Sequence, residues 1–256
     1  MNVTQRDKTL FDNIAKKYGI KDIVYSSKYP RKAQVISVCR KVFQERNNLN
    51  ILEIGCGIGA PASYLNGYFD QYTGIDHSEK LIEQAREFNS DIENTQFVVS
   101  DIESFAKDNT REFDVILAVG VLHHIEDLSK NLPLIRNMLT ESGFFIAIEP
   151  QAGNPFIGLM RQIRKKIDKS YSSDQRFFDS EELRAFLVES KFVDIEIRHI
   201  NYLSKPFMEV VPPFHKLFIP LSVLCTKIDS LLNKSSCLIG KFSWDLVVYC
   251  QKNKDA

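Results

Sequence analysis

The stretch Asn50–Tyr64, NILEIGCGIGAPASY, decides the fold of this 256-residue chain. Its first part, Ile51–Ile54, is a short apolar run typical of a buried strand, and it carries one carboxylate at Glu53. Three glycines follow at alternate positions, and Pro61 then stands where a helix would begin, because a first-turn N–H has no partner inside the helix. Strand, glycine turn and helix start together predict a nucleotide-type site, since glycines allow close backbone approach and the free N–H groups face the ligand.

The glycine spacing alone leaves two kinds of ligand open. Gly55, Gly57 and Ala60 satisfy the G-x-G-x-x-G/A pattern of dinucleotide-binding turns, which would indicate an NAD-dependent oxidoreductase. With Gly59 and the preceding Glu53, the first two glycines also form E-x-G-x-G-x-G, which resembles the first motif of class I S-adenosylmethionine-dependent methyltransferases. Charge favours the second reading, because a carboxylate would repel a pyrophosphate but suits the ammonium group of a methionine moiety.

Acidic residues after the next two apolar runs extend this resemblance. Asp76 lies 21 residues beyond Gly55, the usual interval for an acid that binds ribose hydroxyls, although it would also suit a helix cap. In the resembling family an acid at the position of Asp101 binds the adenine amino group while the neighbouring Ile102 packs on the ring; capping a short helix is the alternative for Asp101. The resemblance places the following residues at S-adenosyl-L-methionine: Glu53, Gly55, Cys56, Gly57, Gly59, Asp76, His77, Asp101, Ile102 and Val119.

The segment Gly120–Asp127, GVLHHIED, resembles the family's segment after its fourth strand, where acceptors enter. An alcohol or phenol acceptor must lose a proton as it becomes a nucleophile, and histidine is suited to accept it. Motif position favours His124 as the catalytic base, with His123 as the second candidate and a packing role as the alternative. Glu149 and His199 lie near strand ends and are weaker candidates. No metal-ligand spacing is present, which argues against the magnesium-dependent catechol type.

Alternating apolar runs and helical patterns predict an α/β fold. The resemblance implies a Rossmann-like, seven-stranded, mostly parallel sheet with helices on both faces and the last strand antiparallel. The expected strands are 51–54, 71–76, 95–99, 113–119, 144–150, 192–200 and 243–251. Between the fourth and fifth of these, a helix is expected over 128–139 and a turn over 141–143.

We expect residues 1–256 to form a single methyltransferase domain with an N-terminal helical cap at 1–46 and a cofactor-binding core at 47–150. In the cap, helical spacing predicts helices over 8–18, ended by Gly19, and over 31–46. Between them, 25–31 is expected to be a linker or part of the acceptor site.

Two inserted segments are expected to shape the acceptor site. Residues 151–178 predict a basic helix that is either solvated or in contact with a phosphorylated acceptor or an anionic membrane. Residues 203–242 are long for a connection, and from Leu221 their apolar positions recur at helical spacing. This apolar helix would pack on the sheet edge, wall an apolar acceptor pocket or make peripheral membrane contact.

Composition excludes several classes of partner. The formal net charge is zero, so no overall field points to nucleic acid. Five scattered cysteines without a C-x-x-C pair favour free thiols in a reducing compartment. The N-terminus lacks the apolar core of a signal peptide, and no apolar stretch approaches the ~18–20 residues of a membrane span. These features predict a cytoplasmic protein.

We therefore expect a biosynthetic, metal-independent transferase that methylates a small molecule, most directly at oxygen. A secondary-metabolite, sugar or lipid-linked intermediate, apolar or phosphorylated, is the expected acceptor. The alternatives are a quinone or lipid C-methyltransferase and a non-catalytic regulator that binds S-adenosyl-L-methionine. The sequence specifies neither the acceptor nor the oligomeric state.

Overall fold

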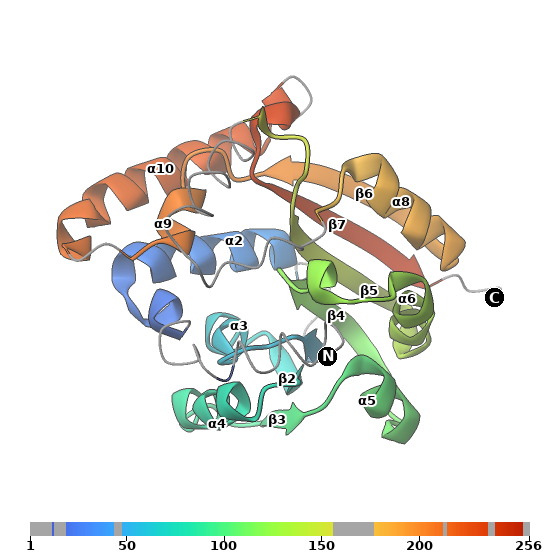
Figure 1. Ribbon diagram of the computed structural model, residues 1–256. Helices are drawn as coiled ribbons and strands as arrows, with labels where there is room; N and C mark the ends of the chain where they lie inside the picture. Colours follow the sequence, from blue (N-terminus) through green and yellow to red (C-terminus); the bar gives the residue numbers. More distant parts are fainter. Residues whose placement is uncertain are drawn as a thin grey trace.

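The computed structural model describes residue 12 and residues 19–43, 48–155, 177–211, 214–234 and 239–252 (Figure 1). Their strands form one sheet in the order β3-β2-β1-β4-β5-β7-β6. The strands are β1 Leu49–Ile54, β2 Phe69–Asp76, β3 Thr95–Val99, β4 Phe113–Val119, β5 Leu139–Pro150, β6 Phe192–Ile200 and β7 Asp245–Lys252. β1 to β5 pair in parallel, whereas β7 is antiparallel to both β5 and β6. The expected Rossmann-like sheet with an antiparallel last strand is thus confirmed.

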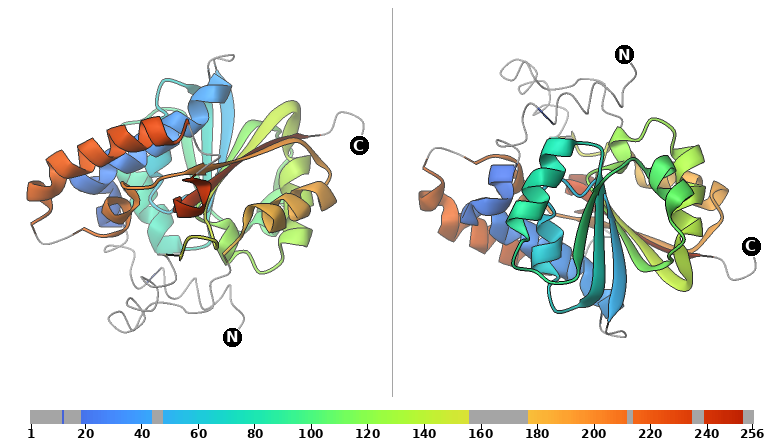
Figure 2. Two further views of the ribbon diagram at one scale, coloured as in Figure 1. Left: turned by 90° about the horizontal axis from the view of Figure 1, so that it is seen from above. Right: turned by 90° about the horizontal axis from the view of Figure 1, so that it is seen from below.

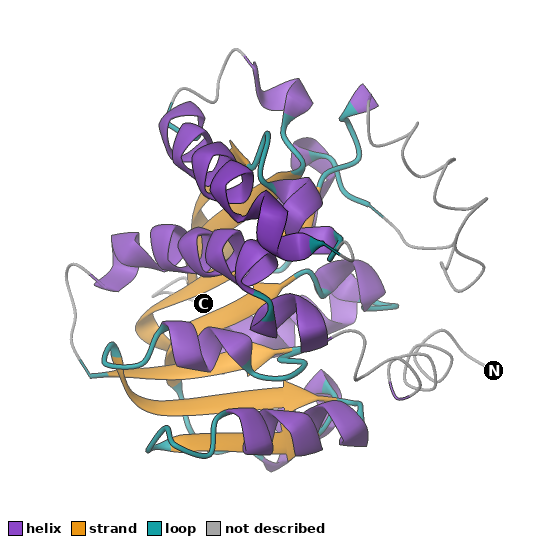
Figure 3. Ribbon diagram, turned by 90° about the vertical axis from the view of Figure 1, so that its left-hand side faces the viewer, coloured by secondary structure: helices purple, strands orange, loops and turns teal. Residues whose placement is uncertain are grey.

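Helices cover both faces of the sheet (Figure 2). The longer ones are α2 Tyr25–Phe43, α3 Ala60–Tyr64, α4 Glu79–Phe88, α5 Ile102–Asp108, α6 Leu128–Asn137, α8 Ser180–Glu189, α9 Lys205–Glu209 and α10 Ile219–Leu232. Apolar side chains of α2, α3 and α4 join one core cluster, and those of α5, α6 and α8 join the other. α9 and α10 pack on α2, so that α10 forms an outer layer (Figures 1 and 3).

Strand β4 shows why the apolar runs fold as a central sheet. Val115 and Leu117 belong to one core cluster, and Ile116 and Ala118 belong to the other. Successive side chains of a strand point to opposite faces, so a continuous apolar run is needed where both faces are covered. The run at 113–119, which is apolar apart from Asp114, therefore predicted a central strand with the bounds that are observed.

Helix α2 begins earlier than the sequence predicted. It starts at Tyr25 and contains Pro30, so the expected linker 25–31 is helical. A proline inside a helix leaves the carbonyl four residues earlier without its N–H partner, here the carbonyl of Ser26. The hydroxyl of Ser222 on α10 donates to that carbonyl at 2.6 Å. A side chain from 196 residues further along the chain thus replaces the bond that Pro30 cannot make.

The start of the cap also differs from expectation. Residues 19–23 are helical, so Gly19 does not end a helix. Apart from Asp12, the expected helix 8–18 lies outside the described residues, as do residues 44–46 at the end of the expected helix 31–46.

The turn expected over 141–143 is part of strand β5 instead. In the pairing with β4, Phe113 lies opposite Leu139 but Val115 lies opposite Phe144, so the register shifts between them. β5 therefore contains more residues than β4 over this interval and accommodates them in a bulge. The polar residues between Leu139 and Phe144 have the composition of a turn, and the same composition also fits a bulge.

The two inserted segments are described to different extents. Of 151–178, residues 156–176 and hence the expected basic helix lie outside the described part. Within 203–242, the structure has α9, a 3₁₀ turn at His215–Phe218 and α10, which confirms the helix expected from Leu221. None of the helices in the described stretches is long and apolar enough to cross a bilayer.

Candidate active site

The glycine turn after β1 packs tightly against its surroundings. Gly55 has a φ of 64°, and a Cβ there would lie 2.3 Å from Cγ2 of Val121, which follows β4. Gly59 precedes α3 with a φ of 67°, and a Cβ there would lie 2.5 Å from the ring of Phe97. Both positions require glycine, because other residues rarely adopt this conformation and have no room for a side chain here.

Asp76 at the end of β2 fixes the position of this turn. One of its carboxylate oxygens accepts a hydrogen bond from the Gly57 N–H at 2.9 Å, and the other accepts one from the Ser78 N–H at 2.9 Å. Helix α4 is capped by Ser78, not by Asp76. Each carboxylate oxygen can accept a second bond, so Asp76 still has the capacity to bind a ribose diol.

Glu53 on β1 is a buried carboxyl group that accepts a hydrogen bond from the Tyr72 hydroxyl at 2.6 Å. Its pKa is raised from 4.5 to about 8, mainly by burial and also by the charges of Asp22 and Asp76, whereas the hydrogen bond from Tyr72 acts to lower it. A cationic ligand nearby would relieve this unfavourable burial. The site therefore fits S-adenosyl-L-methionine, which carries an ammonium and a sulfonium group, and it does not fit the pyrophosphate of a dinucleotide.

The raised pKa predicts proton release when the cofactor product binds. Below pH 8 the Glu53 carboxyl is largely protonated in the free protein, and a cation beside it favours the ionised form. S-adenosylhomocysteine keeps the ammonium group, so its affinity should rise with pH between about 6 and 8. Calorimetry in buffers of different ionisation enthalpy measures the released proton directly.

Glu53→Gln is the matched variant for this measurement. It keeps a hydrogen-bond acceptor for Tyr72 but cannot ionise, so it should bind more weakly and release no proton. Equal proton release by the variant and the parent chain would show that another group titrates.

The other expected cofactor residues are placed around the same edge of the sheet. Asp101 is exposed and accepts a hydrogen bond from the Ser104 N–H at 2.7 Å, so it caps α5, and Ile102 is buried just after it. The His77 ring lies 3.8 Å from the Asp76 carboxylate. Cys56 is buried in the glycine turn, and Val119 is the last residue of β4. The capping role of Asp101 is observed; its contact with adenine stays a prediction.

A histidine–carboxylate pair lies between the ends of β4 and β5. His123 Nδ1 is 2.7 Å from Glu149 Oε2, and the Glu149 side chain is fully buried. The other oxygen of Glu149 accepts the backbone N–H groups of Val121 at 2.8 Å and Leu122 at 2.7 Å. In the tautomer that carries its proton on Nδ1, His123 donates to Glu149 and presents Nε2 as the unprotonated nitrogen.

His124 is beside this pair, with its ring centroid 4.1 Å from that of His123. The sequence motif favoured His124 as the base, but the structure joins His123 to the buried Glu149. The pairing follows from the strand register: Val119 pairs with Ile148 in the sheet, so the residues just beyond them are neighbours. His199 instead contacts the Ser243 hydroxyl at 3.1 Å, and burial lowers its pKa.

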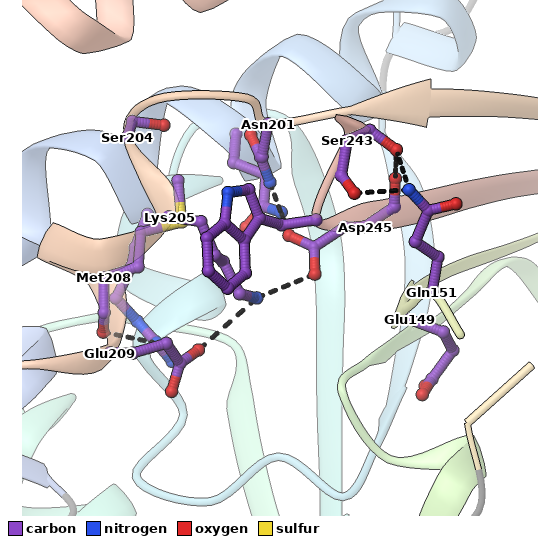
Figure 4. Close-up of polar contacts among 12 residues, drawn as sticks. Glu149, Gln151, Asn201, Ser204, Lys205, Met208, Glu209, Ser243 and Asp245 are labelled. Atoms are coloured by element: carbon purple, nitrogen blue, oxygen red, sulfur yellow. Dashed lines mark hydrogen bonds and ion pairs between the residues drawn. The ribbon is translucent and has the colours of Figure 1, made fainter. Parts of the chain in front are cut away.

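Next to this pair is a polar network that the sequence did not predict (Figure 4). Asp245 pairs in the sheet with Pro150, directly after Glu149, and its carboxylate is 2.8 Å from Lys205 Nζ. Asn201 also donates to Asp245, at 2.6 Å. The network joins the carboxyl end of β5 to the insertion between β6 and β7, where the acceptor site is expected.

Comparison with known proteins identifies the domain that holds the glycine turn. Residues 52–147 match the family described as methyltransferase domain. The malonyl-[acyl-carrier protein] O-methyltransferase of Bacillus anthracis is 24% identical over 190 residues, which cover 72% of this chain and 68% of that protein. The hybrid PKS-NRPS synthetase iliA of Neonectria sp. is 31% identical over 131 residues, which are 47% of this chain but only 3% of that protein.

Solved structures show the same fold. An S-adenosylmethionine-dependent methyltransferase of Thermotoga maritima, described as a possible histamine N-methyltransferase, superposes with a TM-score of 0.63 at 17% identity and covers 96% of this chain and 99% of that one. The chain therefore contains a methyltransferase domain, and its fold is that of the class I S-adenosylmethionine-dependent methyltransferases. S-adenosyl-L-methionine is the cofactor of that class.

Proposed function

We propose that this chain transfers a methyl group from S-adenosyl-L-methionine to an oxygen atom of a small-molecule acceptor. The observation that carries the proposal is the contact of 2.7 Å between His123 Nδ1 and the buried Glu149. Such a pair provides a basic nitrogen in a fixed orientation, as deprotonation of a hydroxyl acceptor requires.

Bound cofactor supplies an electrophilic methyl group on a sulfonium. His123 Nε2 takes the proton of the acceptor hydroxyl while the oxygen forms its new bond to the methyl carbon and the carbon–sulfur bond breaks. Glu149 stabilises the imidazolium that results and keeps the ring in one orientation. The chain's main contribution is alignment, because a displacement of this kind needs the two reacting atoms in line. Gly55, Gly57 and Asp76 are proposed to set the cofactor's position in that alignment.

The acceptor is proposed to be a secondary-metabolite, sugar or lipid-linked intermediate. One matched relative is named as an O-methyltransferase of a carrier-bound malonyl group, and another is a hybrid synthetase. An acceptor with an apolar portion also agrees with the apolar insertion between β6 and β7, which packs on α2 beside the polar network.

The test begins with calorimetry of the full chain. S-adenosylhomocysteine should bind and NAD should not, and the reverse result would overturn the assignment of the cofactor. Hydroxyl and carboxyl acceptors, free and on acyl carrier protein, are then incubated with S-adenosyl-L-methionine, and the product is read as the mass gain of one CH₂ unit.

The type of bond that joins the new methyl group to the product distinguishes the remaining candidate functions. A methyl ether or ester in the product supports the proposal. A new carbon–carbon bond would identify a C-methyltransferase, in which the same base removes a proton from carbon. Cofactor binding without turnover of any acceptor in extracts of the source organism would favour a regulator.

A further inference from the structure

Helix α10 presents its polar side to the protein. Ser222 donates to the Ser26 carbonyl of α2, and both Ser222 and Asp229 are buried. The Asp229 carboxylate accepts the backbone N–H groups of Leu203 and Ser204, both at 2.9 Å, and the Ser204 hydroxyl at 2.6 Å. These polar side chains are spaced by about two helical turns and therefore lie on one side of the helix.

The opposite side of the same helix is apolar and exposed. Leu217, just before α10, and Leu221, Leu224 and Leu231 on it have between 49% and 77% of their surface exposed. Their spacing of three, four or seven residues aligns them in one stripe, which also includes the partly exposed Ile228. We call the five residues Leu217, Leu221, Leu224, Ile228 and Leu231 the outer stripe.

The outer stripe reverses the usual arrangement of a surface helix. Such a helix normally turns its apolar side to the core and its polar side to water. The polar side of α10 is occupied by specific hydrogen bonds, so the helix cannot rotate to bury the stripe without breaking them. Exposed apolar side chains continue along the preceding segment at Val210, Phe214 and Phe218. A contiguous apolar surface of this kind is typical of an interaction site.

Charge indicates what covers this surface. Lys216, Lys227 and Lys234 are exposed along the stripe. From residue 210 to residue 234 the sequence contains one acidic residue, Asp229, and it is buried. A second copy of the chain that docked through this same surface would therefore bring only like charges to these lysines, whereas anionic lipid headgroups complement them.

We propose that α10 and the segment before it dock on the surface of an anionic membrane, with the outer stripe among the acyl chains and the lysines at the headgroups. A helix that lies in the interface buries its apolar side to a shallow depth and keeps its cationic groups in the polar layer. α10 forms the outermost layer of its side of the molecule, so the sheet remains outside the bilayer (Figure 3). The proposal is independent of the methyl transfer reaction.

The test is flotation of the full chain with vesicles of phosphatidylcholine alone or with about one third phosphatidylglycerol. Binding should be at least about tenfold stronger to the anionic vesicles, because three lysines near the surface contribute about 1 kcal/mol each. Lys227→Gln with Lys234→Gln should lower that binding more than tenfold, at about fivefold per lysine. The triple variant Leu221→Gln, Leu224→Gln and Leu231→Gln should remove most binding to both kinds of vesicle.

Val188→Gln on α8 is the matched control, since Val188 is also an exposed apolar residue on a helix but lies away from the stripe. It should bind as the parent chain does. Circular dichroism and thermal unfolding establish that each variant folds. The proposal is wrong if the parent chain does not float with anionic vesicles, or if Val188→Gln weakens binding as much as the triple variant. It is also wrong if the triple variant converts a dimer to a monomer while vesicles leave the parent chain unbound.

Discussion

Replacing Glu149 with glutamine is expected to lower kcat by roughly 10²–10⁴-fold without unfolding the protein. One oxygen of Glu149 accepts the N–H groups of Val121 and Leu122, so the glutamine will place its carbonyl oxygen there. Its NH₂ group must then face His123 Nδ1, and only an unprotonated Nδ1 can accept from it. The ring proton moves to Nε2, and the nitrogen proposed to act as the base is blocked.

His123→Gln and His124→Gln complete this experiment. The first should lower kcat to a similar extent, and the second should leave kcat within a few-fold of the parent chain. Affinity for S-adenosylhomocysteine, measured by calorimetry, should be unchanged in all three, because the pair is proposed to act on the acceptor. If kcat fell strongly in His124→Gln but only slightly in Glu149→Gln, His124 would be the catalytic base, as the sequence motif favoured.

Replacing Lys205 with methionine is expected to lower the free energy of unfolding by about 3–5 kcal/mol, because it leaves the Asp245 carboxylate buried without its cation. Burial raises the pKa of Asp245, and Lys205 and Asn201 oppose this shift. Although burial acts to lower it, the pKa of Lys205 is held above its usual range by the carboxylates of Asp245 and Glu209. Glu209 keeps a second partner, Lys21 at 3.2 Å, in the variant.

Urea unfolding followed by circular dichroism measures this loss. The double variant Lys205→Met with Asp245→Asn removes both charges and should recover most of the lost stability. Lys130→Met, which removes an exposed ion pair with Glu103, is the matched control and should barely change the unfolding midpoint. If the double variant is no more stable than Lys205→Met, the cost lies in packing of the lysine stem and not in the uncompensated charge.

The sheet was predictable from the sequence because its strands carry their own signals. β3, β4 and β6 have the expected bounds, since each is an apolar or alternating run that ends at polar residues. The start of α2 was not predictable, because Pro30 normally indicates a break. The helix tolerates Pro30 because the Ser222 hydroxyl bonds to the Ser26 carbonyl, and Ser222 reaches this position only when the whole chain has folded.

The candidate site was predictable to the extent that it depends on local motifs. The glycine turn and Asp76 were expected at one site, and the structure joins them through the bond from the Gly57 N–H. The pairing of His123 with Glu149 depends on the register between β4 and β5, which the motif does not contain. The ion pair of Lys205 and Asp245 depends on how the insertion folds back onto β7, and no local pattern indicates it.

The bond between Ser222 and the Ser26 carbonyl has a consequence for exchanging parts among related enzymes. Insertions between strands are attractive units for transplantation, because they lie outside the central sheet. Here the insertion completes the backbone hydrogen bonding of the N-terminal helix, and Met208 also accepts a bond from the Ser27 hydroxyl. A chimera that shortened residues 203–242 would expose this gap at Pro30. Helix α2 and the insertion must therefore be transferred together.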